Sequence, residues 1–413
     1  MKQQFLFTCA FLLHISHVFS QEVLHVQNNA VLTIQTGASI TISGGIALDN
    51  GSRLTNNGIV TLTKNTKGGS SDWIDNGATA YEYGPGKLVL NSLNEASSHT
   101  LSSKNLFTAL DINAGSVSLV SDIRAVNWQL INGTVNTGNF RAIVTGSTAT
   151  ALQAAAGNTD FSKSWFNGTL RMYATPATIN KYIFPVGNTT GPRLAVCDNL
   201  VADALNNVTY IDAAFKPKPG TDIGLLVAEN GIPDTAVSDA GVWILTPDAI
   251  PTTSTYDLLL YITGFPGLTD NRFAILRRPA GSANAADWSV PAGSTIPATG
   301  SPGRTLAGGY AKRNRVNGFG QFGIGIAGQP PSTVTVSMYP NPSTGQFVVI
   351  ILGSARTYEA KLVDAMGKTL RRFTVSGVNN TTVTGLPAGI YFLVIPAVLN
   401  NGDSFSKRIV IIP

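Results

Sequence analysis

The chain has 413 residues, of which 43% are hydrophobic and 12% charged, and it contains 42 glycines. Its net charge of +5 is a weak field over this length, and no Lys/Arg run exceeds two residues, so nucleic acid is not expected as a partner. Many glycines with few charges are typical of an all-β chain with many turns. The sequence has no metal-ligand spacing, phosphate loop or calcium loop, so no metal or cofactor is expected.

Residues 1–20 have the features of a secretory signal peptide. A lysine precedes a short apolar run, and the Val-Phe-Ser sequence after it suits cleavage behind Ser20. This run is too short to span a bilayer and no other stretch is long enough, so we expect no transmembrane segment. The mature chain is then predicted to begin at Gln21 with one cysteine, Cys197, which cannot form an intramolecular disulfide.

Residues 21–158 are predicted to form a β-solenoid. Short alternating apolar segments are separated by Asn-Gly, Asp-Asn-Gly and Gly-Gly corners. They recur about every six to eight residues, which is too short for sandwich hairpins and suits the faces of a coiled stack. We therefore expect a short parallel β-helix-like repeat region. A flattened antiparallel stack is the alternative, because periodicity does not distinguish the two.

Residues 65–100 interrupt this pattern with an aromatic, acidic and turn-rich stretch, which we expect to project as a loop or an extra hairpin. Its candidate ligand contacts are Asp72, Trp73, Asp75, Tyr81 and Tyr83. Two carboxylates can divide acid and base roles in glycoside cleavage, and Trp and Tyr rings stack on sugars. Sugar binding is favoured over cleavage here. The alternative is a solvated loop whose tryptophan packs back on the solenoid.

From residue 159 the pattern changes to strands separated by Pro and Gly corners, and residues 159–326 are predicted to form a β-sandwich. Residues 327–332 form the expected linker, since they are rich in Pro and Gly. The sequence has no Gly-x-Ser-x-Gly motif with a matching His and Asp. A hydrolase triad therefore has no support, and no catalytic residue is assigned.

Residues 333–413 carry four separated motifs in a fixed order. Their characteristic residues are Pro340, Asn341, Pro342, Gly345, Asp364, Gly367, Gly389, Tyr391 and Lys407. The prolines lack an N–H and indicate a corner, while the alternating runs between the motifs predict a small antiparallel Ig-like β-sandwich. These motifs and their order resemble the type A C-terminal sorting domain of type IX secretion.

This resemblance implies one partner, the type IX secretion machinery, and export through the periplasm to the outer cell surface or the medium. It assigns no role to the exported part. That part is rich in Thr, Ser and Asn and poor in histidines and acids, so we expect a non-enzymatic, adhesin-like or structural surface protein. The alternative is a carbohydrate-binding or polysaccharide-cleaving enzyme on a β-helix. A surface glycan or matrix is a candidate partner in either case.

Overall fold

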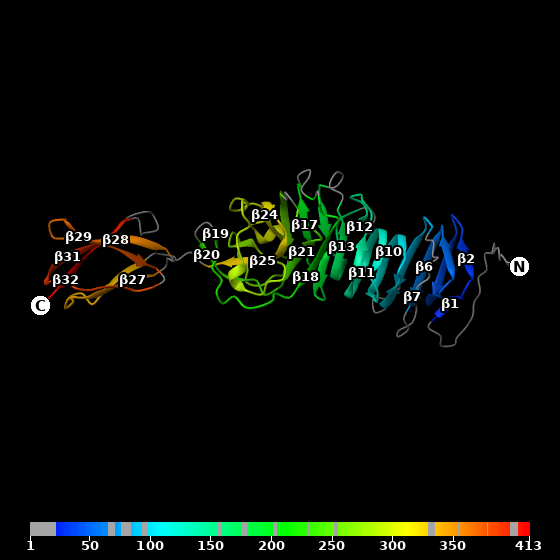
Figure 1. Ribbon diagram of the computed structural model, residues 1–413, viewed down its shortest axis with the longest axis horizontal. Helices are drawn as coiled ribbons and strands as arrows, with labels where there is room; N and C mark the ends of the chain where they lie inside the picture. Colours follow the sequence, from blue (N-terminus) through cyan, green and yellow to red (C-terminus); the bar gives the residue numbers. More distant parts are fainter. Residues whose placement is uncertain are drawn as a thin grey trace. The chain divides into compact units, whose positions relative to one another are not determined.

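The fold is all-β, as the sequence predicts (Figure 1). The computed structural model describes residues 22–64, 71–75, 84–92, 98–155, 158–174, 180–200, 205, 207–229, 232–251, 255–328, 335–352, 356–377, 379–396 and 404–413. The elements that the structure delimits in full within these ranges are strands and the 3-10 helices η2 (Ala285–Asp287) and η3 (Leu306–Gly308). The chain divides into two compact units: the body, residues 1–227 and 234–326, and the tail, residues 228–233 and 327–413.

The first half of the body is a stack of parallel strands in three rows. The first row contains β1 (Glu22–Val26), β4 (Gly45–Leu48), β7 (Ser71–Asp75), β9 (Ser98–Ser102) and the second halves of β10 (Leu106–Leu119) and β11 (Ile123–Val144). The second row contains β2 (Val31–Ile34) and β5 (Arg53–Asn56). The third contains β3 (Ser39–Ser43), β6 (Ile59–Lys64), β8 (Lys87–Ser92), the first halves of β10 and β11, and β12 (Leu152–Ala154).

Each of these strands pairs with a strand from the next turn of the chain, so successive turns lie on one another (Figure 1, blue to cyan). The pairings are parallel, and an antiparallel stack does not describe them. Whether the three rows close into a regular β-helix stays a prediction.

Alternation along the strands builds the core of the stack. In the third row, one residue from each of β3, β6, β8, β10 and β11 forms an apolar line in register: Ile42, Leu62, Leu90, Ile112 and Leu130. All five are buried, the last four at 1% exposure or less. Burying a side chain of this size stabilises the fold by roughly 1.5–3 kcal/mol, so each added turn contributes to the same continuous core.

The structure corrects the expectation that residues 65–100 project from the stack. β7, β8 and β9 come from this stretch, and each pairs with strands on both sides. The prediction followed composition, but five residues suffice for a strand when both neighbouring turns supply hydrogen-bonding edges. Residues 65–70, 76–83 and 93–97 lie outside the described residues.

The second half of the body changes from parallel to antiparallel pairing within one sheet. β13 (Ser164–Tyr173) pairs in parallel with β11 and antiparallel with β18 (Tyr210–Lys216). The same sheet includes β15 (Val186–Asn188), β16 (Gly191–Pro192), β21 (Val242–Pro247), β23 (Phe273–Arg278), β25 (Gly320–Ala327) and, from β20 (Ile232–Val237), the residues 234–237 that belong to the body. A second antiparallel sheet contains β14 (Tyr182–Phe184), β17 (Ala195–Asp198), β22 (Thr255–Tyr261) and β24 (Tyr310–Asn317). One hydrophobic cluster extends from Val26 to Ile324, so the stack and these sheets share a core.

The tail has two antiparallel sheets around its own core, consistent with the predicted small sandwich. One sheet contains β26 (Thr335–Tyr339), β27 (Phe347–Leu352) and β30 (Thr381–Val383). The other has the order β29 (Thr369–Ser376), β28 (Thr357–Asp364), β31 (Gly389–Ile395) and β32 (Phe405–Ile411). Both sheets contribute to one buried cluster, for example Val349 from the first and Leu393 from the second.

Candidate functional site

The first tail motif is fastened to the last strand by the side chain of Asn341. Its Nδ2 donates to the carbonyl oxygen of Arg408 at 2.8 Å, and its Oδ1 accepts from the backbone N–H of Val410 at 2.9 Å. The backbone of Ser343 continues the pairing, because its N–H donates to Val410 and its carbonyl accepts from Ile412. Pro340 and Pro342 have no N–H, so a side chain supplies the rung that the backbone cannot. The corner and the last strand, far apart in sequence, are thus one structural feature.

The second motif closes the turn between β28 and β29. Oδ1 of Asp364 accepts from the backbone N–H groups of Met366 and Lys368, both at 2.9 Å. Gly367 has φ of +82°, a conformation that glycine adopts without steric cost. An aspartate that bonds its own turn and a glycine at positive φ are what this tight connection requires.

The third motif anchors the corner before β31. Tyr391 is 8% exposed, and its hydroxyl donates to the carbonyl oxygen of Pro387 at 2.9 Å. A Cβ at Gly389 would lie 3.2 Å from this hydroxyl, so a larger residue would crowd the bond. Gly345 of the first motif, at φ +97°, accepts from the N–H of Leu386 beside the same corner. The structure therefore brings the first and third motifs together.

The fourth motif differs from the other three in its exposure. Lys407 lies on β32, opposite Leu393, with its side chain exposed to solvent, and the adjacent Arg408 is exposed as well. The first three motifs fix turns and corners, which is a structural role. Of the nine motif residues, Lys407 is the one whose charged side chain faces solvent, where a partner could contact it.

Two of the candidate ligand contacts in the body, Trp73 and Asp75, are buried, although a projecting loop would expose them. Trp73 is 1% exposed and packs edge-to-face on Phe107, with ring centroids 5.5 Å apart. Asp75 is 4% exposed, and its Oδ2 accepts from the Ser103 hydroxyl and the Asn105 amide. The backbone of Asp72, on β7, pairs with Thr100 on the neighbouring strand β9.

These positions correct the interpretation of Trp73 as an exposed platform. It stands in register between Ile46 and Leu101, both core residues, so alternation directs it inward. The Asp75 carboxylate likewise accepts hydrogen bonds from residues in the next turn of the chain. Tyr81 and Tyr83 lie outside the described residues.

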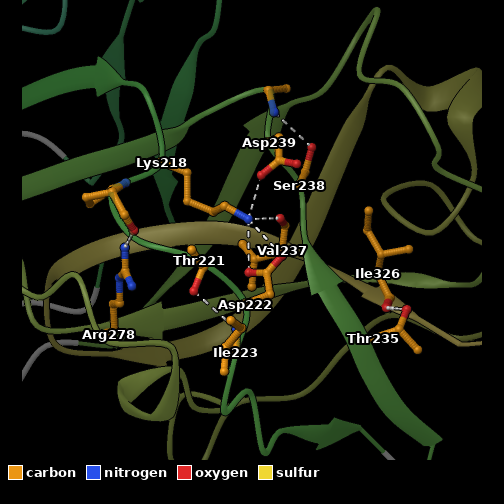
Figure 2. A network of polar contacts seen from close by, with 12 residues as sticks. Lys218, Thr221, Asp222, Ile223, Thr235, Val237, Ser238, Asp239, Arg278 and Ile326 are labelled. Carbon is orange, nitrogen blue, oxygen red and sulfur yellow. Dashed lines mark hydrogen bonds and ion pairs between the residues drawn. The ribbon is translucent and has the colours of Figure 1, made fainter.

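A buried lysine that the sequence analysis did not single out holds a polar network in the body (Figure 2). The Lys218 side chain is 5% exposed, and its Nζ lies 2.8 and 2.9 Å from the two carboxylate oxygens of Asp222. Asp239 and the carbonyl oxygen of Val237 approach it to 2.7 and 2.6 Å. These oxygens accept all three N–H donors of the ammonium group. The network bonds the turn after β18 to the corner after β20. Its one local sequence signal is the four-residue spacing of Lys218 and Asp222.

A second ion-pair cluster joins β11, β13 and β18 where the pairing changes from parallel to antiparallel. Arg171 donates to both oxygens of Asp212, at 2.6 and 2.8 Å, and Arg141 donates to the same carboxylate at 3.2 Å. The Arg171 guanidinium lies 3.5 Å from the ring centroid of Tyr210. The hydrogen bonds to Asp212 raise the pKa of Arg171 against the opposing effect of burial. This geometry stabilises the junction between the sheets.

The body also has a surface groove of about 500 Å³, between residues 245–251, 277–280 and 317–320. Its walls carry one carboxylate, Asp248, and two arginines, Arg277 and Arg278. Burial tends to raise the pKa of Asp248, but the backbone N–H groups of Thr209 and Tyr210, which donate to it, bring the net pKa below its usual value. Glycoside cleavage needs two carboxylates facing each other, and the described lining of this groove provides one.

Comparison with known proteins identifies the tail. Residues 337–412 match the family model of the secretion system C-terminal sorting domain, which confirms the resemblance inferred from the four motifs. This domain supports export by type IX secretion to the cell surface and implies contact with the secretion machinery. No curated protein and no solved structure matches the chain.

Two kinds of feature are absent from the described residues. These residues include no helix of the length and apolarity that crossing a membrane requires. The ranges given above also contain no group of three or more His, Cys, Asp or Glu residues placed to hold a metal ion.

Proposed function

We propose that the exported body is a non-enzymatic, adhesin-like surface protein that binds its target through repeated polar rows on the outside of the stack. The observation that carries this proposal is the register of the outward side chains. Parallel pairing aligns equivalent positions of successive turns, so a residue type that recurs in the sequence becomes a line in space.

Two such rows consist almost entirely of hydroxyls and amides; the exception is Asp72, whose register partner Thr100 belongs to the second row. One row contains Ser43, Thr63, Asn91, Asn113 and Asn132, of which Thr63 is buried and the other four are at least partly exposed. The other contains Thr100, Ser118, Asn136 and Asn167. Within the rows the amides bond to each other: Asn113 donates to Asn91 at 2.8 Å, and Asn167 donates to Asn136 at 2.9 Å.

These rows supply the contacts that a repetitive polymer requires. Neighbouring strands lie about 4.8 Å apart, so each row offers donors and acceptors at regular intervals. The bonds between asparagines fix the amide orientations, and the half-buried side chains leave part of each amide in solvent. A polysaccharide with repeating hydroxyls would make many weak equivalent contacts, whose combined avidity needs no single strong site.

The fixed carboxylates of the stack favour this function over catalysis. Asp111 accepts from Lys87 at 2.8 Å, and Asp75 accepts from Ser103 and Asn105. Each of these acids bonds neighbouring turns to one another. A structural carboxylate of this kind holds the stack in register and is poorly placed for proton transfer to a ligand.

The test uses the mature chain, residues 21–413, on a panel of immobilised polysaccharides, with binding and release of reducing ends measured together. We expect binding without turnover. The double variant Asn113→Ala/Asn136→Ala, with one change in each row, should bind several-fold more weakly. The matched control Asn139→Ala removes an exposed amide of β11 outside both rows and should bind normally.

Two outcomes would contradict the proposal. Equal binding by the row variant and the control would show that the rows do not form the contact surface. Release of reducing ends that Asp72→Asn or Asp75→Asn abolishes would establish the enzyme in place of the adhesin.

A further inference from the structure

The two ends of the stack are not equivalent. At one end β13 and β15 continue the core, and Phe166 and Val186 are fully buried. At the other end the first described turn consists of β1, β2 and β3, and each of these strands pairs on one side only, with β4, β5 and β6 respectively. Among the described residues, the opposite edges of all three strands have no pairing strand.

The apolar core is also less covered at this end. Leu24, Leu32 and Ile40 are each partly exposed. Their register partners one turn further on are Ile46, Leu54 and Val60, which are 1%, 0% and 0% exposed. Val31, at the start of β2, is 66% exposed. Solenoids ordinarily place a polar capping repeat here, because an open end combines unsatisfied backbone groups with apolar side chains.

Apart from Glu22 at the start of β1, this end lacks the residues that normally keep exposed strand edges apart. No Lys, Arg, Asp, Glu or Pro occurs from Val23 to Leu48, although these are the residues that protect natural edges. The later turns do carry basic residues, such as Arg53, Lys87 and Arg124. No aromatic residue lies in residues 22–58 either, so the end offers no platform on which a sugar could stack.

We infer that this end of the stack is a contact surface for a second copy of the chain. A two-fold axis perpendicular to the stack places the three open edges of one copy against those of the other, with the strands antiparallel. Backbone N–H groups of one copy then meet backbone carbonyl groups of the other. Leu24, Leu32 and Ile40 of one copy are covered by the same three residues of the second copy. Of the three edge strands only β1 carries an acidic residue, Glu22 at its start, so most of this surface meets its own copy without like-charge repulsion, whereas an acidic or basic partner would find little complementary charge.

The experiment measures the mass of the mature chain, residues 21–413, by sedimentation velocity from micromolar to hundred-micromolar concentration. We expect a concentration-dependent dimer. The variant Thr33→Lys/Thr41→Lys puts two cations on exposed positions of β2 and β3, where the two-fold contact brings like charges together, and should sediment as a monomer. The control Asn127→Lys/Asn139→Lys adds the same charge to exposed positions of β11, which is paired on both sides, and should remain dimeric.

Hydrogen exchange of the same three proteins locates the contact. Backbone amides of β2 and β3 should exchange more slowly in the wild-type dimer than in the Thr33→Lys/Thr41→Lys variant, while the amides of the tail should not differ. A wild-type chain that is monomeric throughout would overturn the inference. So would a dimer that the edge variant leaves intact, or a dimer whose β2 and β3 amides gain no protection.

Discussion

The tail and the stack both align short β-strands, but they fix the alignment by different means. In the tail, single side chains at the corners do it: Asn341 bonds the backbone of β32, Asp364 closes its own turn, and Tyr391 bonds the carbonyl oxygen of Pro387. In the stack, register comes from rows in which one apolar residue follows another. A side chain that must form a specific hydrogen bond at a corner can be replaced by few residue types, whereas a position in a core row accepts several apolar residue types. The tail therefore has a recognisable sequence and the stack does not.

The largest expected effect concerns the core row that contains Trp73. Replacing Trp73 by Ala removes a fully buried indole packed on Phe107, and should lower the free energy of unfolding of the body by about 3–5 kcal/mol. Denaturant unfolding followed by far-UV circular dichroism measures this change. Trp165→Ala is the control, since the Trp165 side chain is half-buried, and should cost less. A loss below about 1 kcal/mol for Trp73→Ala would contradict its place in the core.

A smaller effect is expected from replacing Asn341, whose side chain bonds a corner of the tail to β32. Asn341→Ala removes two hydrogen bonds to β32, and should destabilise the tail by roughly 1–3 kcal/mol. Hydrogen exchange at the Val410 amide, whose N–H would lose its acceptor, provides a local measurement. Thr344→Ala, at an exposed position in the same motif, is the control. An unchanged tail that is no longer exported would instead make Asn341 a direct contact of the secretion machinery.

The same contrast explains which features the sequence predicted. The corners of the tail were predicted because proline, glycine and aspartate have specific roles in turns, and these roles do not depend on distant residues. The inclusion of residues 71–75 in the stack was missed, because their composition suggests a loop and only the neighbouring turns make them a strand. The Lys218 network was missed because Asp239 reaches it through the fold, at no characteristic spacing.

That network gives the next prediction. Lys218→Met keeps the length of the side chain but leaves Asp222 and the carbonyl oxygen of Val237 without their donor. We expect a loss of roughly 1–2 kcal/mol in the stability of the body, because unsatisfied polar groups near the core are costly. Lys216→Met, on the preceding strand, is the matched control and should have little effect. Equal losses in both variants would show that only general charge matters.

The smallest expected effect is that the thiol of Cys197 does not react in the folded chain. Cys197 is fully buried, and burial raises the pKa of its thiol, with a further contribution from Asp198. A raised thiol pKa means that the neutral form persists at pH 8, and only the thiolate reacts. The folded chain should therefore resist Ellman's reagent at pH 8, while the chain in denaturant should react fully. Rapid modification of the folded chain would contradict the burial of Cys197.

We expect that the tail directs export and that the body folds without it. This expectation is tested most directly by expressing the chain ended at Gln329 in a bacterium with type IX secretion, then fractionating the cells and probing the body with protease. We predict that this chain collects in the periplasm and is as protease-resistant as the body of the full-length protein, since the body and the tail have separate cores. A truncated chain that reaches the cell surface, or one that is degraded as an unfolded protein, would contradict this expectation.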